Sequence, residues 1–164
     1  EHGKPRFFQS EICENLSKTN WYVIPLVWVP VVIFLSRLSH QRCEGSASCY
    51  SALWFCFIFG TLFWSLVEYS VHRFIFHVKT SSYWFNTLHF LFHGCHHKFP
   101  MDDMRLVMPP LGALPIVLMV YGVEYLMFGR ELAPITLSGT LTGYMCYDML
   151  HYHCHFSEFT NKFD

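Results

Sequence analysis

The chain alternates between long apolar segments and shorter polar ones. Four segments are nearly free of charged residues, and each approaches the roughly 20 residues that an α-helix needs to cross the hydrocarbon core of a bilayer. They are Trp21 to Leu35, Tyr50 to Val67, Leu106 to Val123 and Ala133 to Tyr147. This pattern predicts an all-α integral membrane protein with about four transmembrane helices.

The helix breakers refine this prediction. No Pro or Gly interrupts Thr61 to Lys79, so we expect the second helix to continue beyond the membrane surface. A further helical pattern, from Trp84 to Lys98, ends at Pro100. In the fourth apolar segment, Gly139 and Gly143 have the small-xxx-small spacing that lets two membrane helices approach closely.

The first 20 residues are polar and mixed in charge. We therefore expect residues 1–20 to be a cytosolic lead-in or the stub of a linker, which need not be ordered. Residues 21–164 are expected to form one membrane domain.

The composition supports a membrane protein and argues against a nucleic-acid partner. Hydrophobic residues make up 52% of the chain and charged residues only 14%, which does not suit an ordinary soluble domain. The formal net charge is −1 and the basic residues are scattered, so nothing attracts nucleic acid.

The placement of Lys and Arg predicts the orientation in the membrane. With four spans, one side carries Lys4, Arg6, Lys18, Arg73, Lys79, Lys98, Arg105 and Lys162. The other side carries only Arg37, Arg42 and Arg130. The positive-inside tendency puts the richer side in the cytosol. Cys43 and Cys49 then lie in a lumenal loop and are the one pair whose placement would allow a disulfide, which is left open here.

Seven of the eleven histidines lie in three close groups. The groups are His72 with His77, then His93, His96 and His97, then His151 with His155. The predicted topology places all of them on the cytosolic side. Neutral imidazole is a good ligand for iron, zinc, copper and nickel, whereas unliganded clustered histidines would repel one another once protonated. The pattern predicts a cytosolic His-rich metal site with much of the first shell of two ions.

Helical spacing puts the second and third groups each on one helix face, because residues three and four apart are neighbours. His72 and His77 are five apart, about 140° around a regular α-helix. They either flank two neighbouring ions or are brought together by a local distortion of the helix. His89 is left open between a supporting group and a packed interfacial histidine, and His153 is expected to face away from the ions.

Two carboxylates are spaced to support metal-bound histidines. Glu68 lies four residues before His72, and Asp148 lies three before His151. A carboxylate can hold the outer ring nitrogen of a metal-bound imidazole, and a carboxylate at the end of a membrane helix is costly without a partner.

The histidine-rich stretches resemble a known family. The stretch from Glu68 to His77, EYSVHRFIFH, looks like the signature of the membrane fatty acid 2-hydroxylases, in the wider fatty acid hydroxylase and sterol desaturase superfamily. The likeness extends to the stretches Leu88–Asp102, Arg105–Pro110 and Tyr147–Phe156.

The resemblance implies a di-metal enzyme of the endoplasmic reticulum membrane. Such an enzyme uses O2 and electrons from cytochrome b5 and a reductase to hydroxylate C2 of long fatty acyl chains or ceramides for sphingolipid synthesis. All seven grouped histidines match the family's ligand positions. Asp102 joins Glu68 and Asp148 as an expected supporting carboxylate. Iron is the expected metal because zinc cannot change its oxidation state, although zinc can occupy a purified or inactive form.

The chain departs from the family pattern in two respects. Family members carry another His-x-x-His-His soon after the position of His155, but the sequence ends at Asp164 without one. Many members also have an N-terminal cytochrome b5 domain, which is not seen here. We therefore expect a C-terminally incomplete membrane domain, a fragment or shortened isoform, that is inactive alone.

Two alternatives remain open at this point. One is a sterol oxidase or desaturase of the same superfamily. The other is a non-catalytic membrane protein in which bound metal ions only hold the helices together.

Overall fold

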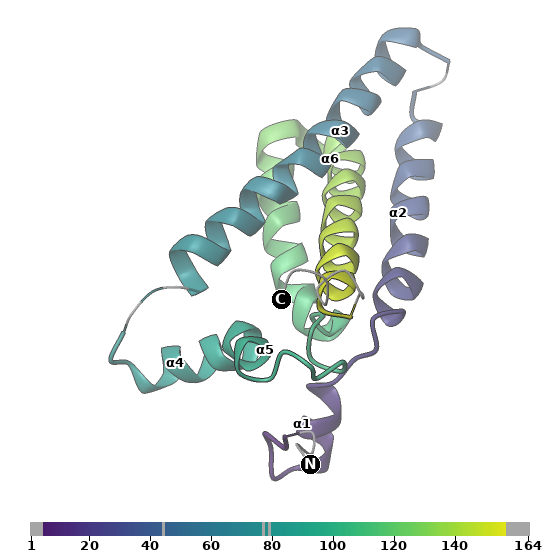
Figure 1. The fold of residues 1–164 in the computed structure, drawn as a ribbon. Helices are drawn as coiled ribbons and strands as arrows, with labels where there is room; N and C mark the ends of the chain where they lie inside the picture. Colours follow the sequence, from purple (N-terminus) through teal and green to yellow (C-terminus); the bar gives the residue numbers. More distant parts are fainter. Residues whose placement is uncertain (1–4, 44, 77, 79, 157–164) are drawn as a thin grey trace.

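The computed structural model describes residues 5–43, 45–76, 78 and 80–156, and this part of the chain is helical without strands. The elements are α1 (Glu11–Leu16), α2 (Val23–Gln41), α3 (Ala47–Ser70), the π-helix η1 (Val71–Phe76), α4 (Tyr83–His89), the π-helix η2 (Phe90–Gly94), α5 (Cys95–Lys98) and α6 (Pro110–Phe156). Their order along the chain can be followed in Figure 1.

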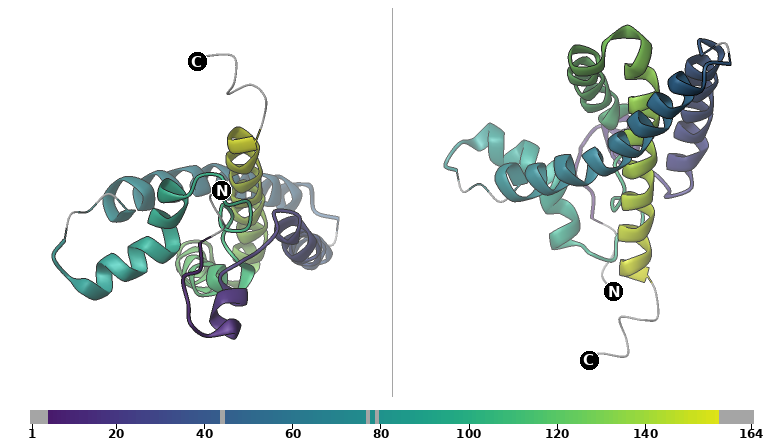
Figure 2. Two further views of the ribbon diagram at one scale, coloured as in Figure 1. Left: turned by 60° about the horizontal axis from the view of Figure 1, so that its bottom comes forward. Right: turned by 90° about the horizontal axis from the view of Figure 1, so that it is seen from above.

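Three stretches are long and apolar enough to cross a membrane: α2, α3 together with η1, and α6. Helix α6 supplies two crossings, because Gly129 has a non-helical backbone (φ 71°, ψ 179°) that divides it into a first arm, residues 110–128, and a second arm, residues 130–156. The arms run side by side in opposite directions (Figures 1 and 2), so that the Thr140 hydroxyl reaches the Glu124 carboxylate. The four predicted spans are therefore present, although the third helix begins at Pro110 and not at Leu106.

The second arm of α6 lies against both α2 and α3. Its glycines face the backbone of α3, where a Cβ added at Gly139 would overlap the carbonyl oxygen of Phe57. A Cβ at Gly143 would lie 2.6 Å from the carbonyl oxygen of Thr61. The predicted close approach of two helices at these glycines is confirmed.

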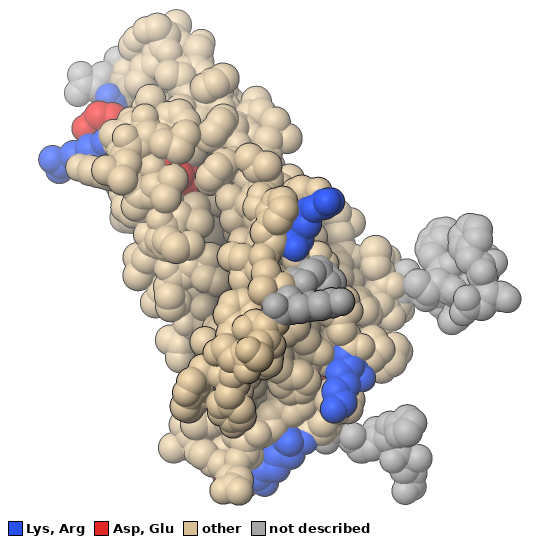
Figure 3. Space-filling model, turned by 90° about the vertical axis from the view of Figure 1, so that its left-hand side faces the viewer, with Lys and Arg blue, Asp and Glu red and all other residues tan. Residues whose placement is uncertain are grey.

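The two ends of the bundle differ. Helices α1, α4 and α5 gather at the end where α6 begins and finishes, and the α2–α3 turn and the bend between the two arms of α6 lie at the other (Figures 1 and 2). Cys43 and Cys49, at the α2–α3 turn, form a disulfide with a Cα–Cα distance of 5.5 Å, so the pairing that the sequence left open is present. On the face in Figure 3, Lys and Arg side chains lie over the middle and lower part of the molecule and also at its upper end, where they stand beside an acidic side chain.

Residues 5–20, for which the sequence did not require order, contain a short helix. Residues 11–16 form α1, which starts where the Ser10 side chain accepts a hydrogen bond from the Cys13 backbone N–H. The segment is tied to the loop before α6 by hydrogen bonds of Glu14 and of the Thr19 backbone N–H, which donates to the Met104 carbonyl at 2.8 Å. Order here depends on contacts with a distant part of the chain, which the local composition does not reveal.

Candidate metal centre

Both π-helices of the structure carry a predicted metal ligand. His72 lies in η1 and His93 lies in η2, in stretches where regular α-helices were expected. A π-helix bonds residue i to i+5, so residues five apart come closer to one face than in an α-helix. The local distortion considered for the His72 stretch is therefore present. His77 lies outside the described residues, so its approach to His72 stays a prediction.

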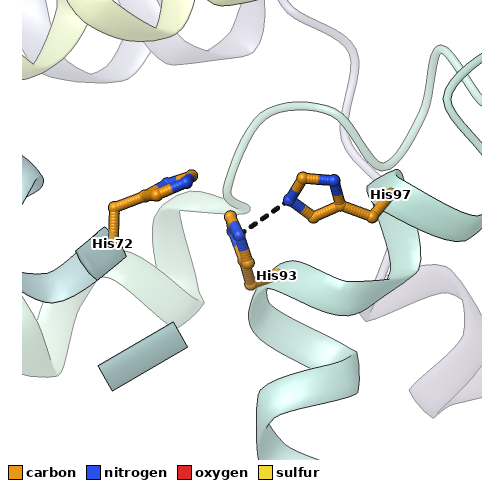
Figure 4. Close-up of side chains that lie close together, drawn as sticks. All are labelled: His72, His93 and His97. Atoms are coloured by element: carbon orange, nitrogen blue, oxygen red, sulfur yellow. Dashed lines mark hydrogen bonds between the residues drawn. The ribbon is translucent and has the colours of Figure 1, made fainter. Parts of the chain in front are cut away.

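In the structure the histidines form two groups that differ from the groups along the sequence. The first of these structural groups joins three elements. His72 from η1, His93 from η2 and His97 from α5 offer ring nitrogens that all lie within 4.8 Å of one another. The Nε2 atoms of His93 and His97 are 2.9 Å apart (Figure 4). His93 is buried with 4% of its surface exposed, so the centre of the group is shielded from water.

The second group lies beside the first. His151 and His155, one turn apart on the second arm of α6, have Nε2 atoms 3.2 Å apart. The His96 ring faces them, with centroid distances of 5.2 Å to His151 and 6.4 Å to His155. The rings of His96 and His97 are stacked 4.6 Å apart, which links the two groups. The structure thus brings six of the seven predicted ligands into one cluster.

The donor set fits metal ions. Two nitrogens bound to one ion at ~2.1 Å lie about 3 Å apart when their bonds are near right angles. The close Nε2 pairs have this spacing. Burial, followed by the neighbouring histidines, lowers the pKa of His93 to about 3 and that of His96 to about 3. At neutral pH both rings are therefore neutral, which is the form that binds metals.

The predicted supporting carboxylates contact other groups. The Tyr147 hydroxyl is a polar neighbour of Glu68, and Tyr144, whose hydroxyl lies 3.4 Å from the Met108 carbonyl oxygen, is a polar neighbour of Asp148. Asp102 accepts a 2.7 Å hydrogen bond from Arg105 and a second hydrogen bond from the Met104 backbone N–H. Support of the metal ligands by these carboxylates stays a prediction.

The two histidines left outside the ligand set differ in surroundings. The His89 ring lies 6.0 Å from His93 and 6.3 Å from Phe76, in a packed position under the cluster. His153 is exposed, and its orientation away from the ions stays a prediction.

A cavity of about 510 Å³ extends from the histidine cluster into the bundle. Its cluster end is lined by His93, His96 and His151 together with Glu68 and Tyr147. Its walls come from α3, the two π-helices, both arms of α6 and the N-terminal segment, and they are mostly apolar. The sequence motifs marked the chemistry at one end but did not reveal this cavity, because its walls come from elements far apart in the chain.

The N-terminal segment forms part of the cavity wall through Phe7 and Phe8. It is held by Arg105, whose guanidinium lies 4.1 Å from the centroid of the Phe7 ring and donates to the Pro5 carbonyl at 2.9 Å. Arg105 also forms ion pairs with Glu14 at 2.6 Å and Asp102 at 2.7 Å. This ion cluster was missed because its partners are distant in sequence.

Glu14 remains ionised inside this cluster. Burial acts to raise its pKa, but hydrogen bonds from Lys18, from the Phe7 and Phe8 backbone N–H groups and from Arg105 outweigh burial and lower it to about 2. At neutral pH Glu14 therefore carries the negative charge that its ion pairs with Arg105 and Lys18 require. Its contribution to stability would be lost as the pH falls below 4.5 toward the lowered value.

Comparison with known proteins finds relatives that match most of the chain. The chain is 41% identical over 151 residues to the dihydroceramide fatty acyl 2-hydroxylase FAH2 of Arabidopsis thaliana, covering 92% of the chain and 62% of the relative. It is 38% identical over 167 residues to the human fatty acid 2-hydroxylase, covering 92% of the chain and 45% of the relative. The chain is a homologue of the fatty acid 2-hydroxylases.

A solved structure shows the same similarity. The hydroxylase domain visible in full-length scs7p superimposes with a TM-score of 0.81 at 34% identity, covering 98% of this chain and 61% of that one. No family model matches the chain. The chain spans less than two thirds of the length of the fatty acid 2-hydroxylases that it matches.

Proposed function

We propose that the chain carries the membrane domain of an O2-dependent enzyme that hydroxylates C2 of long-chain fatty acyl groups, as free acids or ceramides, for sphingolipid synthesis. The observation that carries the proposal is the junction of six clustered histidines with a mostly apolar cavity. Its homologues are named as hydroxylases of fatty acids, ceramides and dihydroceramides.

The two histidine groups would each hold one metal ion. His72, His93 and His97 would bind the first, and His96, His151 and His155 the second, with His77 as a further ligand. Iron bound at these sites would supply the redox chemistry that activates O2 for attack on an unactivated C–H bond.

The residues around the ions would position the substrate. The apolar walls remove the acyl chain from water and align it along the cavity. The pairs Glu68–Tyr147 and Tyr144–Asp148 line the cavity beside His96 and His151 and offer polar groups near the cluster. They would bind the polar end of the acyl group, so that C2 faces the ions.

The remaining assignments follow from orientation and resemblance. We place the chain in the endoplasmic reticulum membrane as a multi-pass protein with the histidine cluster toward the cytosol. Electrons would come from a cytochrome b5-type donor and its reductase, and residues 21–164 would form the hydroxylase domain after a lead-in of residues 1–20. The excess of Lys and Arg in the segments on the predicted cytosolic side supports this orientation.

The test is a transplant. The chain replaces the matching segment of the Saccharomyces cerevisiae ceramide very long chain fatty acid hydroxylase, to which it is 38% identical, in yeast lacking its own enzyme. Mass spectrometry of extracted sphingolipids should detect 2-hydroxy acyl products. His93→Ala should abolish them and halve the iron content or more, whereas the exposed His153→Ala should change neither.

Absence of 2-hydroxy products from a correctly inserted transplant with bound metal would overturn the proposal and favour the non-catalytic metal-binding alternative. Hydroxylated sterols in place of 2-hydroxy acyl lipids would favour the sterol enzyme.

A further inference from the structure

The cavity ends between the two arms of α6. The lining residues farthest from the histidine cluster along each arm are Val120 and Leu137, which are buried with 6% and 7% of their surfaces exposed. Thr140, 2% exposed, lines the same end. Among the residues that the structure describes, none that lines this cavity lies beyond these positions toward Gly129.

A buried polar pair lies at this end. Glu124, one helical turn beyond Val120, is fully buried, and its carboxylate accepts the Thr140 hydroxyl at 2.5 Å. Thr140 also lies 3.2 Å from the carbonyl oxygen of Gly60 on α3, so the pair joins both arms to the neighbouring helix. An acyl chain could extend further only by separating a buried hydrogen-bonded pair, which is costly in an apolar environment.

We infer that Val120, Leu137 and the Glu124–Thr140 pair form a fixed floor that sets the length of acyl chain the cavity accepts. This inference rests on the proposed function, because it takes the occupant to be a fatty acyl chain with its polar end at the histidines. Glu124, which has no role at the metal centre, closes the floor.

The depth of the cavity gives a scale. From Thr140 to His151 the second arm rises about 16 Å, at ~1.5 Å per residue. With carbon–carbon bonds of ~1.5 Å in a zigzag, an extended chain of roughly a dozen carbons spans this distance. Longer chains have to bend or leave their excess outside the floor region.

Changing the floor should change the preferred length. Val120→Phe fills the end of the cavity and should remove room for about two methylenes, so binding of the longest accepted fatty acid should weaken roughly tenfold while shorter ones still bind. Leu137→Ala deepens the floor and should shift the preference toward longer chains. Leu118→Phe is the matched control, because Leu118 lies on the same arm, is 61% exposed and does not line the cavity.

The experiment uses the chain in lipid nanodiscs with fatty acids of increasing length that carry a diazirine at the terminal carbon. After illumination, peptide mapping by mass spectrometry should find the longest accepted probe attached near Val120 and Leu137. Val120→Phe should shorten the longest probe that labels these positions, and Leu118→Phe should not. If Val120→Phe does not fold, the deciding result is whether Leu137→Ala increases the length of the longest probe that labels the protein.

Labelling of lipid-facing positions only, or an identical length profile in all variants, would overturn the inference. The result is independent of catalysis. Altered length profiles without any 2-hydroxy product in the transplant would retain the floor and reject the proposed function. Hydroxylation with unchanged length profiles would retain the proposed function and reject the floor.

Discussion

Arg105 shows how one side chain can join distant parts of a chain. Its guanidinium is 3% exposed and holds Glu14 of α1, Asp102 of its own loop and the backbone of Pro5 together. A buried cation between two carboxylates adds little net stability compared with apolar packing, but removing one partner leaves uncompensated charge in the interior. Its role is therefore to fix where the N-terminal segment lies against the cavity.

Replacing this cation tests that role. Arg105→Met removes one cationic partner from Glu14 and the cationic partner of Asp102, and should destabilise the protein by about 3 kcal/mol. Arg6→Met is the control, because Arg6 is 55% exposed and pairs with Glu11 at 3.5 Å, a contact worth about 0–1 kcal/mol. Thermal unfolding in detergent, followed by circular dichroism, compares the two. Equal melting temperatures would show that the buried cluster is dispensable.

Among the elements, the contact between α3 and the second arm of α6 depends on small residues. Besides the glycines, the Thr61 hydroxyl reaches the Gly139 carbonyl at 3.2 Å across the interface. Between membrane helices the apolar effect gives no drive to associate, so close packing and such hydrogen bonds supply it. The histidines of α6 keep their position relative to η1 through this contact.

Adding a methyl group tests the close approach. Gly139→Ala forces the Cβ into the Phe57 carbonyl, so the helices must separate, at a cost of about 1–3 kcal/mol. Gly122→Ala, on the first arm, meets nothing within 4 Å and should be neutral or stabilise by up to about 1 kcal/mol. Chemical unfolding in mixed micelles measures both changes. A stable Gly139→Ala protein with an unchanged histidine cluster would contradict this account.

The sequence predicts those elements whose cause is local. The apolar segments, the end of α5 before Pro100 and the glycine contact of α6 follow from composition and spacing along one helix. The two π-helices could not be predicted in this way, because the hydrophobic periodicity of about 3.6 residues is the same for a regular α-helix and for one that contains a π-helical turn. The same limit applies to the metal centre: spacing groups His93 with His97, but the approach of His72 depends on how separate elements pack.

At the scale of the whole molecule, the cysteines at the two ends of the bundle differ: one end has a disulfide and the other has free thiols. The disulfide of Cys43 and Cys49 lies at one end, while the exposed free thiols of Cys13 and Cys154 lie at the other, with the histidines. Disulfides persist in the lumen, whereas cytosolic thiols stay reduced. This distribution supports the orientation deduced from the basic residues.

Labelling in sealed microsomes tests the orientation. A membrane-impermeant maleimide should modify Cys13 without further treatment, because we place this exposed thiol in the cytosol. Cys43 and Cys49 should react only after the vesicles are permeabilised and the disulfide is reduced. Peptide mass spectrometry identifies the modified residues, with Cys56, buried at 2% exposure, as the internal negative control. Protection of Cys13 in sealed vesicles would reverse the assigned orientation.

The wide turns of η1 and η2 also determine the rotational phase of the helices. A π-helical turn is equivalent to an α-helix that has gained one residue, so excising one residue within Val71–Phe76 would restore an ordinary helix. The segment beyond would then rotate by roughly 100° relative to α3. Loss of this one residue would therefore leave the membrane-facing surface of α3 in place but would turn the segment beyond α3, with its histidines, in the wrong direction.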